Sequence, residues 1–220
     1  MIVGVFLRYF KTYQGINYIP ITDEDQFCGL VGDNGIGKSS VLESLDCFFN
    51  GLPWTFHTAT KKSGITTTSP YIIPVFLVKK DRFDKEPEVY EKASLISSIA
   101  FEISQEDVSP STAIHMRKFI KHRELLIRNH NSEDYFLLPI GVDHSGNVSF
   151  SIFNSKFFME KYFEGSSIPE NQNTLTSEQL NTFKIVVDKL KETIEYIYIP
   201  REINPEDFTR LETNEIQVLM

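Results

Sequence analysis

The segment of residues 32–39 restricts the fold of this chain more than any other feature. It reads Gly-Asp-Asn-Gly-Ile-Gly-Lys-Ser and satisfies the pattern G-x-x-x-x-G-K-[S/T] in full, which requires a strand before it and a helix after it. Residues 27–31 predict a short buried strand, and Gly51 supplies a helix stop. Between them the apolar residues recur at helical spacing, at Val41, Leu42, Leu45, Phe48 and Phe49. The order strand, glycine loop, helix predicts an α/β fold built around a phosphate-binding loop.

The residue types of this loop suit a polyphosphate and magnesium. Glycines let backbone N–H groups close around phosphate oxygens, and the positive end of the helix that begins near Gly37 points at the same oxygens. Lys38 is expected to neutralise the β- and γ-phosphates, and the Ser39 hydroxyl is expected to bind Mg²⁺. We therefore predict binding of a nucleoside triphosphate with Mg²⁺, with Lys38 as the catalytic residue. The alternative is a chance match on a glycine-rich turn.

Hydrophobic periodicity predicts further strands and helices. Residues 2–10 and 15–21 are expected to form an antiparallel pair. Residues 143–147 contain Gly and Asn between apolar runs, which favours a hairpin and a second antiparallel sheet. Thr176 and Gln179 match a capping box. Other strands are expected at 71–78, 95–103, 136–142, 148–153 and 196–199, the last ended by Pro200, and helices at 112–127 and 177–194.

Composition narrows the class of protein. The 220 residues are 41% hydrophobic, enough for a core, and the net charge of −8 argues against a surface that coats nucleic acid in general. No stretch approaches about 18 continuous apolar residues and no secretion signal is evident. A soluble cytoplasmic protein without membrane contact is therefore expected. Cys28 and Cys47 lie in apolar segments that flank the loop and are expected to be buried thiols.

Residues 32–40 resemble the loop G-x-N-G-x-G-K-S-S that is typical of the ABC ATPases of the SMC, RecF and OLD-nuclease branch. Residues 7–13 resemble the opening segment K-N-F-R-S-[FYH] of that branch. This resemblance places Phe10 on the family's Phe and Lys11 on its basic residue near the nucleotide, with Tyr9 in place of the usual Asn. A solvated turn lysine is the alternative for Lys11. The expected nucleotide-binding residues are Lys11, Gly32, Asp33, Asn34, Gly35, Ile36, Gly37, Lys38, Ser39 and Ser40.

The resemblance implies an α/β fold, that of a P-loop NTPase of the ABC-ATPase type. Residues 1–200 would form its N-terminal lobe with an antiparallel β subdomain, and residues 201–220 would begin a linker or helical arm. ATP and Mg²⁺ are the implied cofactors, and a homodimer through the ATPase heads would control a DNA-processing or anti-phage defence nuclease. Residues 196–201 are similar to the Y-I-P-x-R run of OLD-type and related defence ATPases. This similarity favours Septu-type and retron-associated ATPases or the N-terminal part of an OLD-family nuclease.

Several parts of an ABC ATPase are not found in these 220 residues. A Ser-Gly-Gly signature, an Asp-Glu pair after an apolar strand and a switch histidine are missing, and Glu202 is a poor substitute because it follows Pro200. The chain alone is therefore expected to lack turnover. A nucleotide-binding subunit of a transporter would carry these motifs in one chain, and a small-molecule kinase would not begin with a strand pair. An ATP-binding scaffold without turnover stays open.

Acidic and histidine residues indicate neither a nuclease nor a metal centre. Asp23 and Asp25 form an isolated D-x-D without the glutamate that would hold a second metal ion. The histidines lack the spacing of metal ligands and are expected at the surface or at caps. They are His57, His115, His122, His130 and His144.

The predicted helix that begins at 112 is basic in an otherwise acidic chain. Its cations either contact a nucleic-acid backbone or form a solvated face. Phe119, Leu126 and Ile127 are expected to turn toward the core while most of the cations share the other face. The cations are Arg117, Lys118, Lys121, Arg123 and Arg128, opposed only by Glu124.

Overall fold

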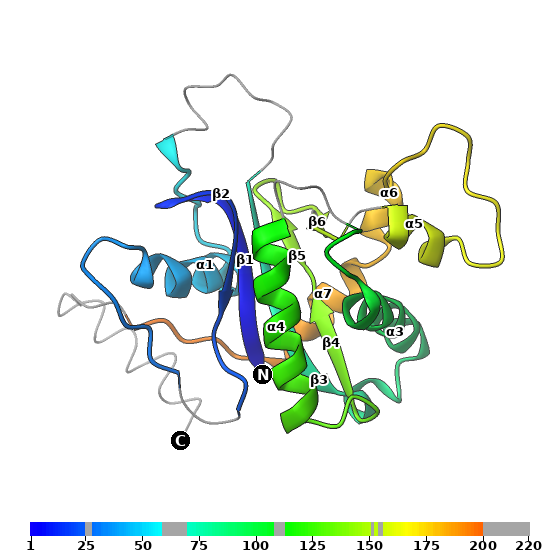
Figure 1. Ribbon diagram of the computed structural model, residues 1–220, viewed down its shortest axis with the longest axis horizontal. Helices are drawn as coiled ribbons and strands as arrows, with labels where there is room; N and C mark the ends of the chain where they lie inside the picture. Colours follow the sequence, from blue (N-terminus) through cyan, green and yellow to red (C-terminus); the bar gives the residue numbers. More distant parts are fainter. Residues whose placement is uncertain (25–27, 59–69, 108–112, 151, 154–155, 200–220) are drawn as a thin grey trace.

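The computed structural model describes residues 1–24, 28–58, 70–107, 113–150, 152–153 and 156–199. They form a mixed α/β domain around one six-stranded antiparallel sheet, in the order β2-β1-β3-β5-β6 with β4 also paired to β3. The strands are β1 (Ile2–Phe10), β2 (Tyr13–Pro20), β3 (Tyr71–Lys79), β4 (Tyr135–Pro139), β5 (Gly141–Asp143) and β6 (Val148–Ser149). β3 holds the sheet together, because it pairs with β1 on one side and with β4 and β5 on the other (Figure 1).

The sequence of β3 explains its central place. Every residue of the strand except Lys79 is buried, as expected for an apolar run that is covered on both faces. β5 approaches β3 so closely that a Cβ added at Gly141 would lie 2.0 Å from the carbonyl oxygen of Ile72. Because glycine has no Cβ, the chain can lie this close to β3 where β5 begins, and β4 and β5 both pair with β3.

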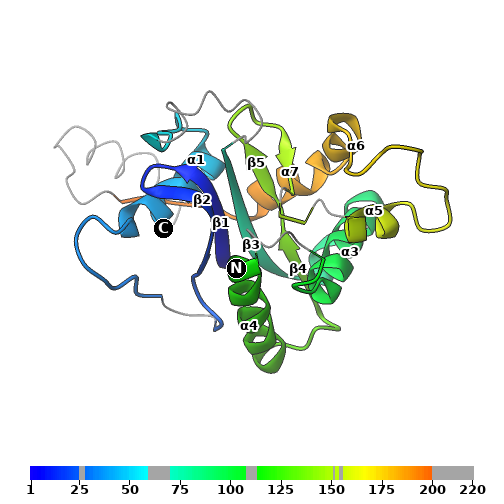
Figure 2. The ribbon, with the colours of Figure 1, turned by 45° about the horizontal axis from the view of Figure 1, so that its top comes forward.

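Two helices cover opposite faces of the sheet. In Figures 1 and 2, α1 (Lys38–Asn50) and α4 (Ala113–Asn129) lie on different sides of β1. Phe119 of α4 packs on Phe6 with ring centroids 5.6 Å apart, and Phe48 of α1 packs on Phe76 at 6.1 Å. Phe6 is paired with Ile73, three residues before Phe76, so the two contacts point to opposite faces.

The described ranges contain further helices. They are the 3-10 helix η1 (Lys80–Phe83) and the helices α3 (Pro87–Glu102), α5 (Lys156–Tyr162), α6 (Ser177–Asn181) and α7 (Lys184–Thr193). Of these, α7 lies next to α1, where Lys191 Nζ is 4.6 Å from the centroid of the Phe48 ring. α3 covers β4, and α5 and α7 pack against α3. No helix within the described ranges is both long enough and apolar enough to span a membrane.

Several sequence predictions are confirmed. The N-terminal strand pair is β1 and β2, the strand at 71–78 is β3, and the basic helix is α4. Asp143 Oδ1 accepts the N–H groups of Ser145 at 2.8 Å and Asn147 at 3.0 Å, which fixes the predicted hairpin between β5 and β6. α6 begins at the capping box of Thr176 and Gln179.

The prediction of a strand at 95–103 is wrong, because most of this segment belongs to α3. Buried Val89, Ala93, Ile96 and Ala100 recur at helical spacing, and Pro87 occupies the first turn. The prediction of a second sheet is also wrong, since β3 joins all strands into one. The helix predicted at 177–194 is interrupted at Thr182 and divides into α6 and α7.

Two predicted strands beside α1 are absent from the described residues. Residues 28–31 and 196–199 have no strand, and the Val31 side chain is 92% exposed. Cys28 is exposed, so a buried thiol is confirmed only at Cys47. The strand predicted at 136–142 is divided at 140, and the one at 148–153 ends at 149. Residues 25, 27 and 200–220, with the predicted arm at 201–220 and Glu202, lie outside the described ranges.

Candidate nucleotide-binding site

The glycine loop depends on backbone conformations that other residues avoid. Gly32, Gly35 and Gly37 have φ of 149°, 84° and 101°. A Cβ added at Gly37 would also lie 2.5 Å from Thr12 Oγ1, an atom of the turn between β1 and β2. Gly37 thus allows the loop to bend into α1 and to lie against that turn.

The first turn of α1 offers backbone donors to an anion. Gly37 is the N-cap residue, and it provides no side-chain cap, nor does an acidic residue stand in the first turn. The N–H groups at the start of a helix have no partner within the helix, and the helix dipole makes them attractive to negative charge. The loop and the helix start together form a cradle for phosphate oxygens.

Lys38 reaches back over this loop. Its Nζ donates to the carbonyl oxygens of Gly32 at 2.5 Å and Asp33 at 2.7 Å. The ammonium group is thereby held against the backbone of the segment that would surround a phosphate chain. Its compact charge and three donors suit a phosphate in the same place.

The other loop residues differ in exposure. Ser39 is exposed on the first turn of α1, in a position open to a metal ion, whereas Ser40 is buried with 7% exposure and faces the protein interior. The four residues between Gly32 and Gly37 are all exposed, and they are Asp33, Asn34, Gly35 and Ile36. The backbone of the loop, rather than its side chains, therefore forms most of the cradle.

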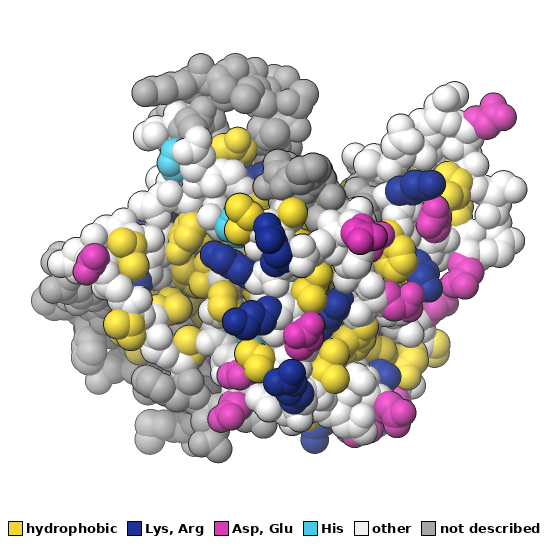
Figure 3. Space-filling model, in the orientation of Figure 1, with side chains coloured by type: hydrophobic (Ala, Val, Ile, Leu, Met, Phe, Trp, Pro, Cys, Tyr) yellow, Lys and Arg dark blue, Asp and Glu magenta, His cyan; other side chains and the backbone are white. Residues whose placement is uncertain are grey.

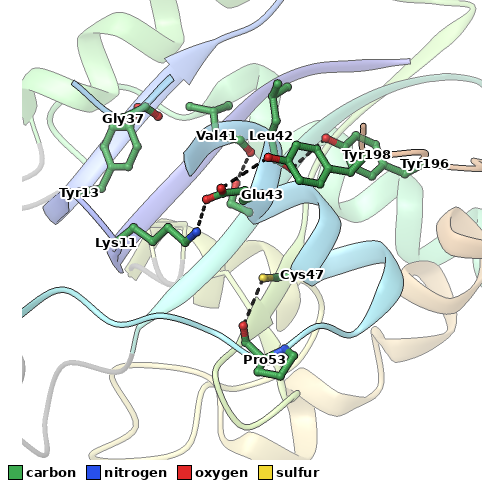
Figure 4. A network of polar contacts seen from close by, with 11 residues as sticks. Lys11, Tyr13, Gly37, Val41, Leu42, Glu43, Cys47, Pro53, Tyr196 and Tyr198 are labelled. Atoms are coloured by element: carbon green, nitrogen blue, oxygen red, sulfur yellow. Dashed lines mark hydrogen bonds and ion pairs between the residues drawn. The ribbon is translucent and has the colours of Figure 1, made fainter. Parts of the chain in front are cut away.

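Lys11 is not a freely solvated turn lysine. It lies in the turn after β1 with φ of 47°, and Tyr9 near the end of β1 also has a positive φ, 53°. The Lys11 backbone N–H donates to the carbonyl oxygen of Thr55 at 2.8 Å, and its Nζ forms an ion pair with Glu43 of α1 (Figure 4). Because Glu43 follows Ser39 by four residues, both lie on one side of α1. The structure thus places Lys11 beside the helix that carries the metal-ligand candidate.

Tyr13 is a site residue that sequence reasoning missed. Its hydroxyl donates to the carbonyl oxygen of Gly37 at 3.2 Å, and its ring touches the position where a Cβ of Gly37 would stand. Burial raises the pKa of Tyr13. The only signal in the sequence is an aromatic residue at the end of the opening segment.

A second missed element is the segment that follows α7 and lies along α1. The Tyr196 hydroxyl donates to the carbonyl oxygen of Leu42 at 2.8 Å, and its ring stacks on Phe49 with centroids 5.5 Å apart. The Tyr198 hydroxyl donates to Glu43 Oε1 at 3.5 Å. As Figure 4 shows, Glu43 is therefore contacted from both sides, by Lys11 and by Tyr198.

The cations of α4 divide into two groups. Arg117, Lys118, Lys121 and Arg128 are exposed, and Figure 3 shows a row of Lys and Arg side chains over this helix. Arg123 is different, because it donates to the carbonyl oxygens of Ala100 at 2.8 Å and Ile103 at 2.9 Å at the end of α3. Its role in the described structure is to attach α4 to α3.

The apolar side of α4 matches the prediction in part. Phe119 and Leu126 are buried, as predicted. Ile127 is 42% exposed, so its predicted place in the core is wrong.

Histidines of α4, and His130 just after it, contact β2 and the segment that follows β2. His115 Nδ1 accepts the backbone N–H of Tyr18 at 3.0 Å, and His122 Nδ1 lies 2.7 Å from the Tyr18 hydroxyl. His122 Nε2 lies 3.1 Å from the carbonyl oxygen of Thr22, and His130 Nε2 lies 3.3 Å from that of Asp23. Because a carbonyl oxygen only accepts, Nε2 of His122 carries the proton and Tyr18 donates to Nδ1.

Within the described ranges no cluster of His, Cys, Asp or Glu could hold a metal ion.

The glycine loop, the uncapped helix start and Lys38 together define a P-loop nucleotide-binding protein. The chain matches the family described as AAA ATPase domain, AAA_15, over residues 1–217, and it belongs to that family. This P-loop NTPase family includes SMC-, RecF- and OLD-like ATPases, and membership implies ATP binding and ATP hydrolysis. A comparison with curated proteins found no match, and neither did one with solved structures.

Proposed function

We propose that this chain is the nucleotide-binding lobe of an ABC-type ATPase that dimerises around Mg-ATP and controls a DNA-processing or anti-phage defence nuclease. The observation that carries the proposal is the cradle of residues 32–39, where glycine conformations, an uncapped helix start and Lys38 Nζ converge. The resemblance of residues 32–40 and 7–13 to the SMC, RecF and OLD branch supports the finer assignment.

The residues of the loop have separable roles in this proposal. Backbone N–H groups from Gly35 to Ser39 hold the phosphate oxygens, and Lys38 exchanges its contacts with the loop carbonyls for the β- and γ-phosphates. Ser39 supplies a hydroxyl ligand for magnesium, which neutralises phosphate charge when bound. The ion pair between Lys11 and Glu43 positions the turn after β1 beside the same end of α1.

Hydrolysis in this proposal requires groups from outside the described residues. Exposed apolar side chains lie in the loop before α1, at Val31 (92%) and Ile36 (54%), on α1 at Leu42 (43%), and in the segment after α7 at Ile199 (65%). Such a concentration beside a phosphate loop supports contact with further protein. The proposed contact is the remainder of the ATPase and the head of a second copy.

A nucleotide titration tests the proposal. Lys38→Ala should abolish binding of a fluorescent ATP analogue with Mg²⁺, because the phosphates lose their main counter-charge. Lys85→Ala, at an exposed lysine between η1 and α3, is the matched control and should bind as the parent does. Equal affinity in the parent and Lys38→Ala would refute the assignment. Robust ATP turnover by the isolated 220-residue chain would refute the proposed division between lobes.

A second candidate function is contact with nucleic acid through α4. The exposed row of cations on this helix favours it, as does attachment of the helix to Thr22 and Asp23, which precede the glycine loop. Reversal of Arg117, Lys118 and Lys121 to Glu should weaken nucleic-acid binding by the complete complex, and the loss should shrink as salt rises. ATP binding should survive.

The matched control reverses three exposed cations elsewhere, Arg82, Lys85 and Lys184, with the same change in net charge. If both triple variants lose the same affinity, only the total charge matters. If neither loses affinity at low salt, the face of α4 is merely solvated.

A further inference from the structure

A hollow on the side of the molecule away from the glycine loop has the features of a docking site. It lies between α3 and the α5 region and has a volume of about 820 Å³. Tyr90, Leu95 and Tyr162 give it apolar walls, and Ser94 and Ser98 of α3 line it one helical turn apart.

The aromatic walls of this hollow are held in place from the protein side. The Tyr90 ring packs on Phe136 of β4 with centroids 5.0 Å apart, and the Tyr162 ring lies 6.0 Å from Phe183. Side chains that are already ordered lose less conformational entropy when a partner binds. The hollow is therefore a preformed surface.

The rim of the hollow is acidic. Asp84, Glu91 and Glu164 are all exposed, and in the described part of the chain none of them forms a salt bridge. The one cation of the lining, Lys161, has its Nζ 2.8 Å from Glu102. Its pKa is raised mainly by that hydrogen bond, with a smaller contribution from Glu164. Figure 3 shows several Asp and Glu side chains on the α3 and α5 side of the molecule, with a few Lys and Arg side chains among them, away from the row of cations over α4.

We propose that this hollow, named here the α3–α5 groove, binds a basic amphipathic helix of a partner protein. Leucine-like side chains of that helix would enter between Tyr90 and Tyr162, and Lys or Arg at its margins would face Asp84, Glu91 and Glu164. This partner site is separate from the glycine loop, so it does not depend on the proposed nucleotide function.

A defined peptide tests the groove. The probe is a fluorescein-labelled, helix-forming peptide of Leu and Lys, and its matched control has Glu in place of every Lys. Fluorescence anisotropy with the 220-residue chain should show binding of the Lys peptide and binding at least tenfold weaker, or none, of the Glu peptide. Hydrogen exchange should show protection of α3 and α5.

Two variants and two controls separate the groove from general charge and from the glycine loop. Glu91→Lys with Glu164→Lys should weaken binding at least tenfold, and Ser94→Trp, which fills the hollow, should do the same. Glu88→Lys with Glu178→Lys changes the net charge equally at exposed positions outside the hollow and should bind as the parent does. Lys38→Ala should also bind the peptide as the parent does.

Equal binding of the two peptides would overturn the proposal, as would equal losses in both charge-reversed variants. Absence of binding by the Lys peptide at low salt, or protection mapped to another surface, would overturn it as well. Loss of folding in Ser94→Trp leaves the charge-reversed pair to decide.

Discussion

The helices α1 and α4 lie on opposite faces of the same sheet, yet they are held in different ways. α4 is fastened by Arg123 and by histidine contacts to Tyr18 and its neighbours, and Phe119 is buried between aromatic rings. α1 contacts β1 and β3 on one side, exposes Leu42 on another, and follows a loop of exposed residues.

We infer from this difference that residues under α4 mainly determine stability, whereas residues at the start of α1 mainly determine ligand binding. Side chains under α4 have their partners within the chain, so their loss should lower the free energy of unfolding. Groups around the start of α1 present N–H donors and apolar side chains outward, so their change should alter binding more than stability. Three predictions test this division, beginning with the largest effect.

Phe6→Ala should lower the free energy of unfolding by about 3–5 kcal/mol, because it removes a large buried ring. Phe6 is fully buried and packs on Tyr18 with centroids 4.5 Å apart, as well as on Phe119 and Phe153. Urea unfolding measures the change. Leu42→Ala, on the exposed side of α1, should cost less than about 1 kcal/mol. Similar costs for the two variants would contradict the division.

Gly37→Ala should lower the free energy of unfolding by about 1–2 kcal/mol and strongly weaken ATP binding. The new Cβ would require φ near 101° and would meet Thr12 Oγ1. Gly146→Ala is the matched control, because Gly146 also has positive φ, 81°, but nothing lies within 4 Å of its added Cβ. It should cost some stability and keep nucleotide affinity. Unchanged ATP titration in Gly37→Ala would count against the cradle.

Stability should fall as pH drops below about 6.5, the pKa of histidine in an unfolded chain. Burial lowers the pKa of His115 and His122, with a further contribution from Lys118 at His115, while Thr22 and Asp23 partly oppose the shift at His122. The unfolded state therefore binds more protons in this range, and acid favours unfolding. Above that range this contribution to stability is complete.

The measurement compares urea midpoints near pH 7.5 and pH 5.5 in the parent and in His122→Gln. The variant should lose less stability on acidification than the parent. His144→Gln, at an exposed histidine, is the control and should behave as the parent does. An identical pH response in His122→Gln and the parent would show that this contact does not titrate as expected.

Local patterns predicted the parts of the structure that depend on near neighbours. The loop at 32–39, the strand pair at the N-terminus and the capping box at Thr176 each combine residues within a few positions. The segment at 95–103 was ambiguous, because a short apolar run fits both a strand and a buried helix. Its assignment to α3 depends on packing against β4, which is a distant segment of the chain.

Long-range contacts explain the remaining gaps. The pairing of β3 with β1, β4 and β5 merges two predicted sheets, and no short pattern contains that information. The candidate site likewise depends on contacts between distant parts of the sequence. Tyr13 bonds to Gly37 at the start of α1. Glu43 of α1 contacts both Lys11 and Tyr198. The sequence motif identified the loop, whereas the residues that contact the loop and α1 could be found only from the folded structure.

The contact between Tyr196 and Leu42 has a consequence for how the chain folds. It joins residues 154 positions apart, so it closes after nearly all of the described chain has been synthesised. Contacts of such large sequence separation form slowly, because a long loop must be ordered first. β1 and β2 can pair early as neighbours, while α1 gains its tyrosine contacts last. On the ribosome, α1 can therefore complete its contact with Tyr196 only after residue 196 has been synthesised.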